Sequence, residues 1–141
     1  MKVAVSACLL GRNCKYNGGH NFCGEVAAFL EGKEVLPICP EILVMPAPRA
    51  PVELRGGRAV DEEGRDVDAL YRCGVARTLE AVEAFLPDLV ILKARSPTCS
   101  VREIYDGTFQ GRLIAGSGLL AAALIRRGFR VEDENTFKEN R

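Results

Sequence analysis

Four short apolar segments alternate with segments of helical periodicity, and this order constrains the fold more than any other feature of the sequence. Three of the four are apolar at nearly every position, which is typical of strands whose two faces are both covered by helices. Alternating strands and helices favour an α/β fold with a mostly parallel sheet. The expected strands are KVAVSA (2–7), EVLPI (34–38), DLVILKA (88–94) and FRVED (129–133).

The segments between these strands have apolar residues three or four positions apart, as helices do. In the longest segment, Asp66 or Asp68 is a candidate N-cap and Pro87 ends the helix. In the last segment, Ser117 is a candidate cap and Gly128 ends the helix. The three expected helices lie within GEVAAFLEG (24–32), RDVDALYRCGVARTLEAVEAFLPD (65–88) and GSGLLAAALIRRG (116–128).

A chain of 141 residues has the length of one ordinary domain. We expect residues 1–133 to form a single compact, Rossmann-like α/β domain, with helices flanking the sheet, and residues 134–141 to form a frayed C-terminal tail. The segment ELRGGRAVD (53–61) is predicted to form a small β-hairpin insertion that turns at Gly56 and Gly57.

Charge and hydropathy argue against two classes of partner. Lysine and arginine together number 19, as do aspartate and glutamate, so no net charge attracts the chain to DNA or to anionic lipid. The longest apolar runs end at charged residues, proline or glycine, well short of the roughly 20 residues that a membrane span requires. We therefore expect a cytoplasmic protein, a monomer or small homo-oligomer, that binds neither DNA nor membranes.

The chain has six cysteines, and we expect no secretion signal ahead of them, so the compartment is predicted to be reducing and disulfides rare. Metal or thiolate chemistry is then the hypothesis to test. Cys8 follows the first expected strand, Cys39 the second and Cys99 the third. Because the loops after the carboxyl ends of parallel strands meet at one edge of a sheet, these three cysteines are predicted to converge on one site.

The other three cysteines have different interpretations. Cys73, in the middle of the longest helix, and Cys23, at the start of the first helix, are expected to be small apolar residues of the core. Cys14 shares the first loop with Cys8 and is either a fourth thiolate or a resolving thiol.

The spacing of the cysteines bears on the kind of metal. No C-x-x-C pair occurs, whereas closed four-thiolate sites usually contain such pairs. Three distant thiolates suit an iron–sulfur cluster with one open iron better than they suit zinc, and an open metal position is typical of a catalytic site. Two alternatives stay open: a structural zinc in a binding protein, and sulfur or cluster transfer through Cys14.

Residues beside the expected thiolates are candidates for proton transfer. Glu41 lies two residues after the second strand-end cysteine and Ser96 three residues before the third, so an acid and a hydroxyl would lie near the metal. Each has an equally good structural interpretation, Glu41 as a cap or ion-pair partner and Ser96 as a turn residue. Lys93 and Arg95 are expected to lower the pKa of the Cys99 thiol.

These residues lie within sequence blocks that resemble the thiouracil desulfurase family. The blocks follow the family's order from residue 3 to about residue 132, nearly the whole chain. They are VSACLLG with CKYNG, PICPE with the proline-rich run after it, GRDVDA, LKARSPTCS with IYDGTFQG, and GSGLLAA.

The resemblance implies an α/β domain that holds a [4Fe-4S] cluster through Cys8, Cys39 and Cys99. In that family the open iron takes the sulfur of a thionated uracil, and hydrolysis gives uracil and hydrogen sulfide without net redox change. The resemblance thus implies a small thionated pyrimidine as partner and catalytic roles for Glu41 and Ser96. The expected substrate-binding residues are Ser6, Tyr16, Asn17, Arg49 and Lys93.

The chain departs from the family's pattern in two places. CPEILVMPAPR has side chains where many relatives have glycines, and Ser100 stands where glycine usually follows the cysteine. Neither change removes an expected cluster ligand or Glu41, and both are expected to reshape the substrate pocket.

Overall fold

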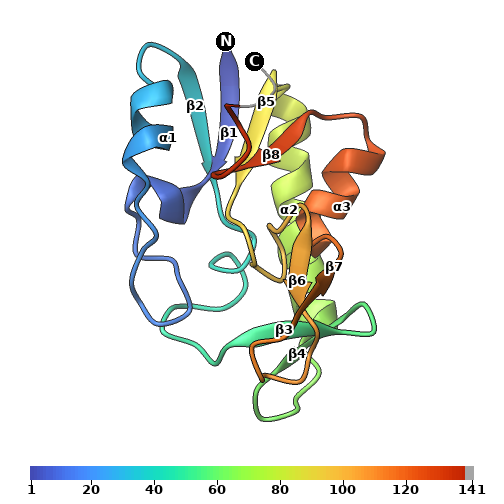
Figure 1. Cartoon of the computed structure of the whole chain (residues 1–141). Coiled ribbons are helices and arrows are strands. Elements are labelled where there is room, and N and C mark those ends of the chain that lie inside the picture. Colours follow the sequence, from blue (N-terminus) through green and yellow to red (C-terminus); the bar gives the residue numbers. More distant parts are fainter. Residues whose placement is uncertain (139–141) are drawn as a thin grey trace.

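A four-stranded parallel sheet forms the centre of the computed structural model, which describes residues 1–138 (Figure 1). Its strands are β1 (Lys2–Ser6), β2 (Glu34–Ile38), β5 (Leu89–Leu92) and β8 (Val131–Asp133). They pair in parallel in the order β2-β1-β5-β8, and each lies within its predicted range. The expected α/β fold is thus confirmed.

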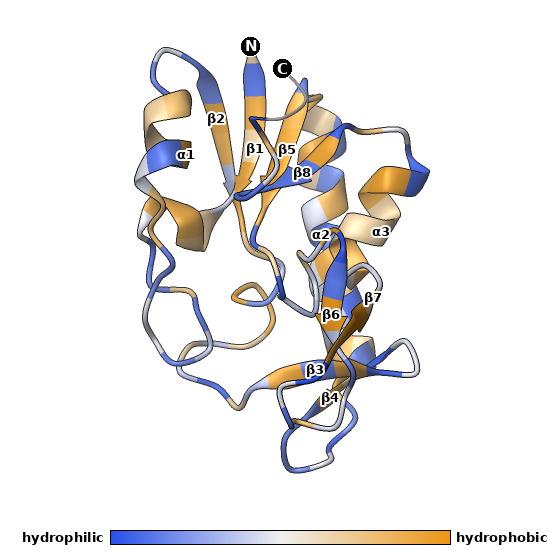
Figure 2. Ribbon diagram, viewed as in Figure 1, coloured by the Kyte–Doolittle hydropathy of each residue, from blue (hydrophilic) through white to orange (hydrophobic). Residues whose placement is uncertain are grey.

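Helices cover both faces of this sheet, as its almost uninterrupted apolar strands require. Because successive residues of a strand point to opposite faces, Val3 and Leu89 pack toward the first helix, whereas Ala4 and Val90 pack toward the other two. Figure 1 shows this division, and Figure 2 shows that β1 and β5, between the helices, are largely hydrophobic. The helices are α1 (Gly24–Phe29), α2 (Asp68–Phe85) and α3 (Leu119–Arg126).

Two of the predicted helix caps form differently. Val67 takes the cap position of α2 and makes no side-chain cap hydrogen bond; the carboxylate of Asp66 instead accepts the backbone N–H of Asp68, the first residue of the helix, at 2.9 Å. The hydroxyl of Ser117 donates to the carbonyl of Val101 at 2.8 Å and does not cap α3, because Gly118 takes the cap position. A glycine is needed there because the backbone of Thr98 and Cys99, in the loop after β5, lies directly against it.

Two antiparallel hairpins lie beyond the carboxyl ends of the parallel strands (Figure 1). The predicted hairpin forms, and both residues of its Gly56–Gly57 turn have positive φ, at 57° and 82°. The second hairpin was not predicted, because three-residue strands separated by a long loop show too little alternation to be recognised. The hairpins are β3 (Val52–Arg55) with β4 (Arg58–Asp61), and β6 (Glu103–Tyr105) with β7 (Leu113–Ala115).

The residues after β8 pack onto the domain. Phe137 is 1% exposed, and its ring meets the ring of Phe29 edge-on, with the centroids 5.2 Å apart. The expectation of a frayed tail is therefore wrong for residues 134–138, and its remainder, 139–141, lies outside the described residues. Between residues 1 and 138, no helix combines the length and apolarity needed to cross a bilayer.

Candidate active site

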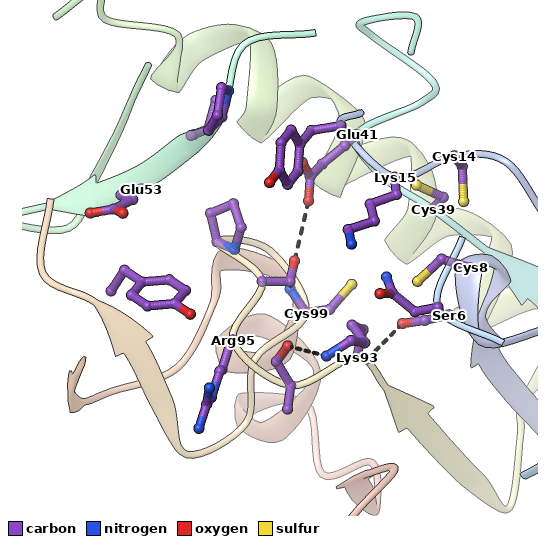
Figure 3. Close-up of a pocket in the computed structure, with 18 of the residues that line it drawn as sticks. Ser6, Cys8, Cys14, Lys15, Cys39, Glu41, Glu53, Lys93, Arg95 and Cys99 are labelled. Carbon is purple, nitrogen blue, oxygen red and sulfur yellow. Dashed lines mark hydrogen bonds between the residues drawn. The ribbon is translucent and has the colours of Figure 1, made fainter. Parts of the chain in front are cut away.

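Three strands end in loops that carry cysteines. Cys8 lies in a 3-10 turn, η1 (Ala7–Leu10), directly after β1; Cys39 directly follows β2; and Cys99 lies in the loop after β5. The hydroxyl of Ser6 accepts the backbone N–H of Lys93 at 2.9 Å and so ties the end of β1 to the end of β5 (Figure 3). Because the strands are parallel, all three loops lie at the same edge of the sheet.

A cavity of about 530 Å³ opens at this edge. The thiols of Cys8, Cys39 and Cys99 point toward a shared space, and Cys14 lies beside the first two of them (Figure 3). The cavity continues to the two hairpins, which add lining residues that the sequence did not indicate. These include Val52, Glu53, Tyr105 and Phe109.

The thiols differ in how readily they ionise. The thiol of Cys14 interacts with the thiols of both Cys8 and Cys39, and this interaction shifts the pKa of all three. The hydrogen bond with Cys14 lowers the pKa of Cys8 to about 7, against the effect of burial and with weaker help from Asn21 and Lys93. The same partner lowers the pKa of Cys39, whereas the pKa of Cys14 itself is raised by its two thiol neighbours. Since the thiolate is the form that binds metals, a lowered pKa suits both Cys8 and Cys39 as candidate metal ligands.

Cys99 behaves differently, because burial raises its pKa to about 12. The prediction that Lys93 and Arg95 lower the pKa of Cys99 is therefore wrong. The ammonium group of Lys93 pairs with Glu134 at 2.9 Å, and its positive charge helps to lower the pKa of Cys8. A coordinated metal would supply the positive charge that Cys99 needs in order to ionise.

The donor set fits an iron–sulfur cluster better than a single metal ion. Within residues 1–138, no group of three or more His, Cys, Asp or Glu side chains is arranged around the position of a single ion. A cubane cluster is larger than an ion, and it takes soft thiolates spread around it.

The surroundings of these thiols also suit an anionic group. The side chain of Arg49 is 4% exposed, its Nε has no hydrogen-bond partner among the described residues, and its charge helps to lower the pKa of Cys39. Arg49 already pairs with Glu41 at 3.4 Å, but its free Nε beside the thiols can still donate to a negatively charged partner. The residues present therefore fit a [4Fe-4S] cluster.

A carboxylate lines the same cavity. The side chain of Glu41 is 13% exposed and receives hydrogen bonds on both of its oxygens. Its Oε2 accepts from the hydroxyls of Ser96, at 3.2 Å, and Thr98, at 2.9 Å. Its Oε1 accepts from the hydroxyl of Tyr71, at 3.2 Å, and the guanidinium of Arg49, at 3.4 Å. Three segments of the chain, at Arg49, at Tyr71 and at Ser96 with Thr98, thus hold one acid at the cavity wall.

Ser96 combines a structural and a chemical position. Its hydroxyl oxygen accepts the backbone N–H groups of Thr98, at 3.2 Å, and Cys99, at 3.0 Å. Because two donors already point at this oxygen, its own proton is directed toward the acceptor Glu41. Ser96 therefore shapes the turn that carries Cys99 and also contacts the acid.

Comparison with known proteins agrees with this geometry. Residues 3–136 match the protein family described as 2-thiouracil desulfurase. The chain belongs to the 2-thiouracil desulfurase family. The uncharacterized protein YbbK of Bacillus subtilis (strain 168) is 38% identical to this family member over 148 residues, an alignment that covers 97% of this chain and 98% of YbbK.

A solved structure extends the comparison to three dimensions. It is named as the [4Fe-4S]-dependent thiouracil desulfidase TudS and matches with a TM-score of 0.89 at 37% sequence identity. The match covers 98% of this chain and 93% of the TudS chain. This member of the 2-thiouracil desulfurase family therefore has the fold of TudS, and the resemblance noted from the sequence blocks is confirmed.

The cavity of this family member includes most, but not all, of the residues expected at a substrate. Asn17 is outside the lining; it is exposed, and its side chain accepts the backbone N–H of Gly19 at 2.9 Å. Asn21 lines the cavity instead and hydrogen-bonds with Cys8. No periodicity in the glycine-rich first loop distinguishes these two asparagines. The expected residues that do line the cavity are Ser6, Tyr16, Arg49 and Lys93.

The two remaining cysteines lie away from the cavity. Cys23 is half-buried and packs beside the core under α1. Cys73 was expected in the core, but it is exposed on α2. The reason is helical geometry, because Cys73 is two residues from both Tyr71 and Val75, whose side chains are buried, and so lies on the opposite face.

Proposed function

We propose that this protein is a [4Fe-4S]-dependent desulfurase that hydrolyses thiouracil, or a related thionated nucleobase or nucleoside, to the oxygen analogue and sulfide without net redox change. In this proposal Cys8, Cys39 and Cys99 hold the cluster and leave one iron free of protein thiolates. The substrate is a small molecule rather than DNA, and the reducing cytoplasm is the expected location.

When bound, the cluster supplies a Lewis-acidic iron that suits a soft thione sulfur and polarises the carbon–sulfur bond. The residues of the chain then have to direct a water molecule to the ring carbon and remove its proton. Glu41 lines the cavity and follows an expected ligand by two residues, so its carboxylate lies where it can accept this proton.

Ser96 and Arg49 act with Glu41. The hydroxyl of Ser96, which donates to Glu41 at 3.2 Å, can donate equally to a substrate atom that gains negative charge as water adds. Arg49 pairs with the same carboxylate at 3.4 Å and also donates to the carbonyl of Cys14 at 2.9 Å. Arg49 thereby links the position of the acid to the loop that carries two of the thiols.

The observation that carries this proposal is the hydrogen bond between Glu41 and Ser96 at the wall of a cavity lined by three strand-end cysteines. A structural metal would require the thiols but not an acid and a hydroxyl facing them. Membership of the 2-thiouracil desulfurase family supports the class of substrate, and the name of TudS supports dependence on a cluster.

Anaerobic purification followed by iron and sulfide analysis tests the proposal. We expect a brown, oxygen-sensitive protein with about four irons per chain. Incubation with 2-thiouracil or 4-thiouracil should release sulfide and uracil in equal amounts. A colourless zinc protein whose stability falls sharply with chelators would instead establish the structural metal alternative.

A further inference from the structure

We propose that Tyr71 and Thr98 are positioning residues that hold the carboxylate of Glu41 in the orientation its proton transfer requires. This inference rests on the proposed function and extends it to two residues to which the sequence assigned no role in the site. The alternative is that the two hydroxyls only satisfy buried hydrogen-bonding groups, and the experiments below separate the two roles.

The two residues bind opposite oxygens of the same carboxylate. The hydroxyl of Tyr71 donates to Oε1 of Glu41 at 3.2 Å, and the hydroxyl of Thr98 donates to Oε2 at 2.9 Å. Tyr71 belongs to α2, whereas Thr98 belongs to the loop after β5. Since each oxygen is held from a different element, the carboxylate cannot rotate without breaking a hydrogen bond.

Both donors are fixed in place by their surroundings. Tyr71 is 1% exposed and packs with the apolar side chains of the β3–β4 hairpin. Thr98 is fully buried, and the backbone of Gly118 lies directly against its own. Burial and the nearby charge of Glu41 raise the pKa of Tyr71, so that the phenol keeps its proton and remains a donor.

The lining of the cavity separates these donors from the other two partners of Glu41. Ser96 and Arg49 line the cavity together with Glu41, but Tyr71 and Thr98 do not. A substrate in the cavity therefore contacts Ser96 and Arg49 directly. The hydroxyls of Tyr71 and Thr98 contact Glu41 from the side that faces the protein interior. A residue in that position acts on the reaction only through the carboxylate it holds.

Tyr71→Phe is the sharper test, because it removes a single hydroxyl that donates to Glu41. In the anaerobically reconstituted protein we expect kcat for sulfide release to fall about tenfold, since misplaced catalytic groups lose rate steeply. KM and iron content should stay unchanged. In a Glu41→Gln background the same substitution should change the residual kcat by less than about twofold, because the carboxylate it positions is gone.

Thr98 needs a different set of variants, because its hydroxyl also lies 3.6 Å from the sulfur of Cys99. Thr98→Val should lower kcat, and Thr98→Ser, which keeps the hydroxyl, should restore it. Thr136→Val is the matched control, since Thr136 is a buried threonine that donates to the carboxylate of Glu132 at 2.8 Å, outside the cavity lining. It should leave kcat unchanged.

Three outcomes for Tyr71→Phe would overturn the inference: an equal loss of kcat in both backgrounds, a change in KM alone, or a loss of iron. A crystal structure of this variant gives a readout without turnover, and we expect the Glu41 carboxylate to leave its wild-type orientation. An unchanged carboxylate would also refute the positioning role. If the carboxylate is displaced in the variant but the wild-type protein releases no sulfide, the proposed function is refuted and the positioning role is not.

Discussion

The α-carbon of Gly74 in α2 lies so close to the carbonyl oxygen of Pro40 that a β-carbon at position 74 would overlap it. Gly118, at the start of α3, lies in the same way against the backbone of Thr98 and Cys99. The backbones of two helices thus contact, at these glycines, the two loops that carry Cys39 and Cys99. These contacts fix the position of each loop relative to the sheet.

Gly74→Ala should displace the loop at Pro40 and with it Cys39. We expect a loss of stability of about 1–3 kcal/mol in thermal denaturation, together with a lower iron content after reconstitution. Gly24→Ala is the control, because a β-carbon there would meet its nearest neighbour at an ordinary 3.9 Å. A stable, fully loaded Gly74→Ala protein would show that the close contact does not position the loop.

Cys8→Ala, Cys39→Ala and Cys99→Ala should each abolish sulfide release and lower the iron content. Each removes one of three ligands, and the cavity offers no equivalent thiolate in its place except Cys14. Cys73→Ala is the matched control, since Cys73 is exposed on α2. Iron analysis and the visible absorption spectrum report the result, and an active Cys99→Ala variant would refute the assigned ligand set.

Cys14→Ser should keep both iron and turnover if Cys14 only donates a hydrogen bond to the ligands. The contacts of Cys14 with Cys8 and Cys39 are also what the sulfur- or cluster-transfer alternative would require. That alternative predicts the opposite result, a loaded but inactive variant. Measuring iron content and sulfide release on the same preparation separates the two.

Glu41→Gln should retain the cluster and lose most of the turnover, by about 100-fold or more, because the shape survives while the proton acceptor does not. The amide can still receive the hydrogen bonds of Ser96 and Thr98 on one side. Steady-state sulfide release, normalised to iron, is the measurement. Unchanged turnover would reduce Glu41 to a structural partner of Arg49.

Asp68 should make stability depend on pH. Burial alone would raise the pKa of Asp68, but the backbone N–H of Ala59 and the guanidinium of Arg72 lower it on balance. A lowered folded-state pKa means that the stabilisation is complete above the unfolded value of about 3.9 and is lost as the pH falls through the folded value.

Asp68→Asn should accordingly lower the melting temperature at pH 7 by about 3–6 °C. The difference from the wild type should shrink below about pH 4, where the wild-type carboxylate itself takes up a proton. Thermal denaturation between pH 3 and pH 7 checks this. A difference that stays constant over the range would show that the charge of Asp68 is not what stabilises the β3–β4 hairpin against α2.

The sequence by itself determined the fold class, the positions of the strands and the placement of Cys8, Cys39 and Cys99 after three of them. These features are local, because hydrophobic periodicity reports which faces of a segment are buried, and parallel strands necessarily end on the same side. Only the tertiary structure decided which partners surround Glu41, since Tyr71 and Thr98 are 30 and 57 residues away in the chain. It also decided between Asn17 and Asn21, because no local pattern says which loop side chain faces a cavity built from distant segments.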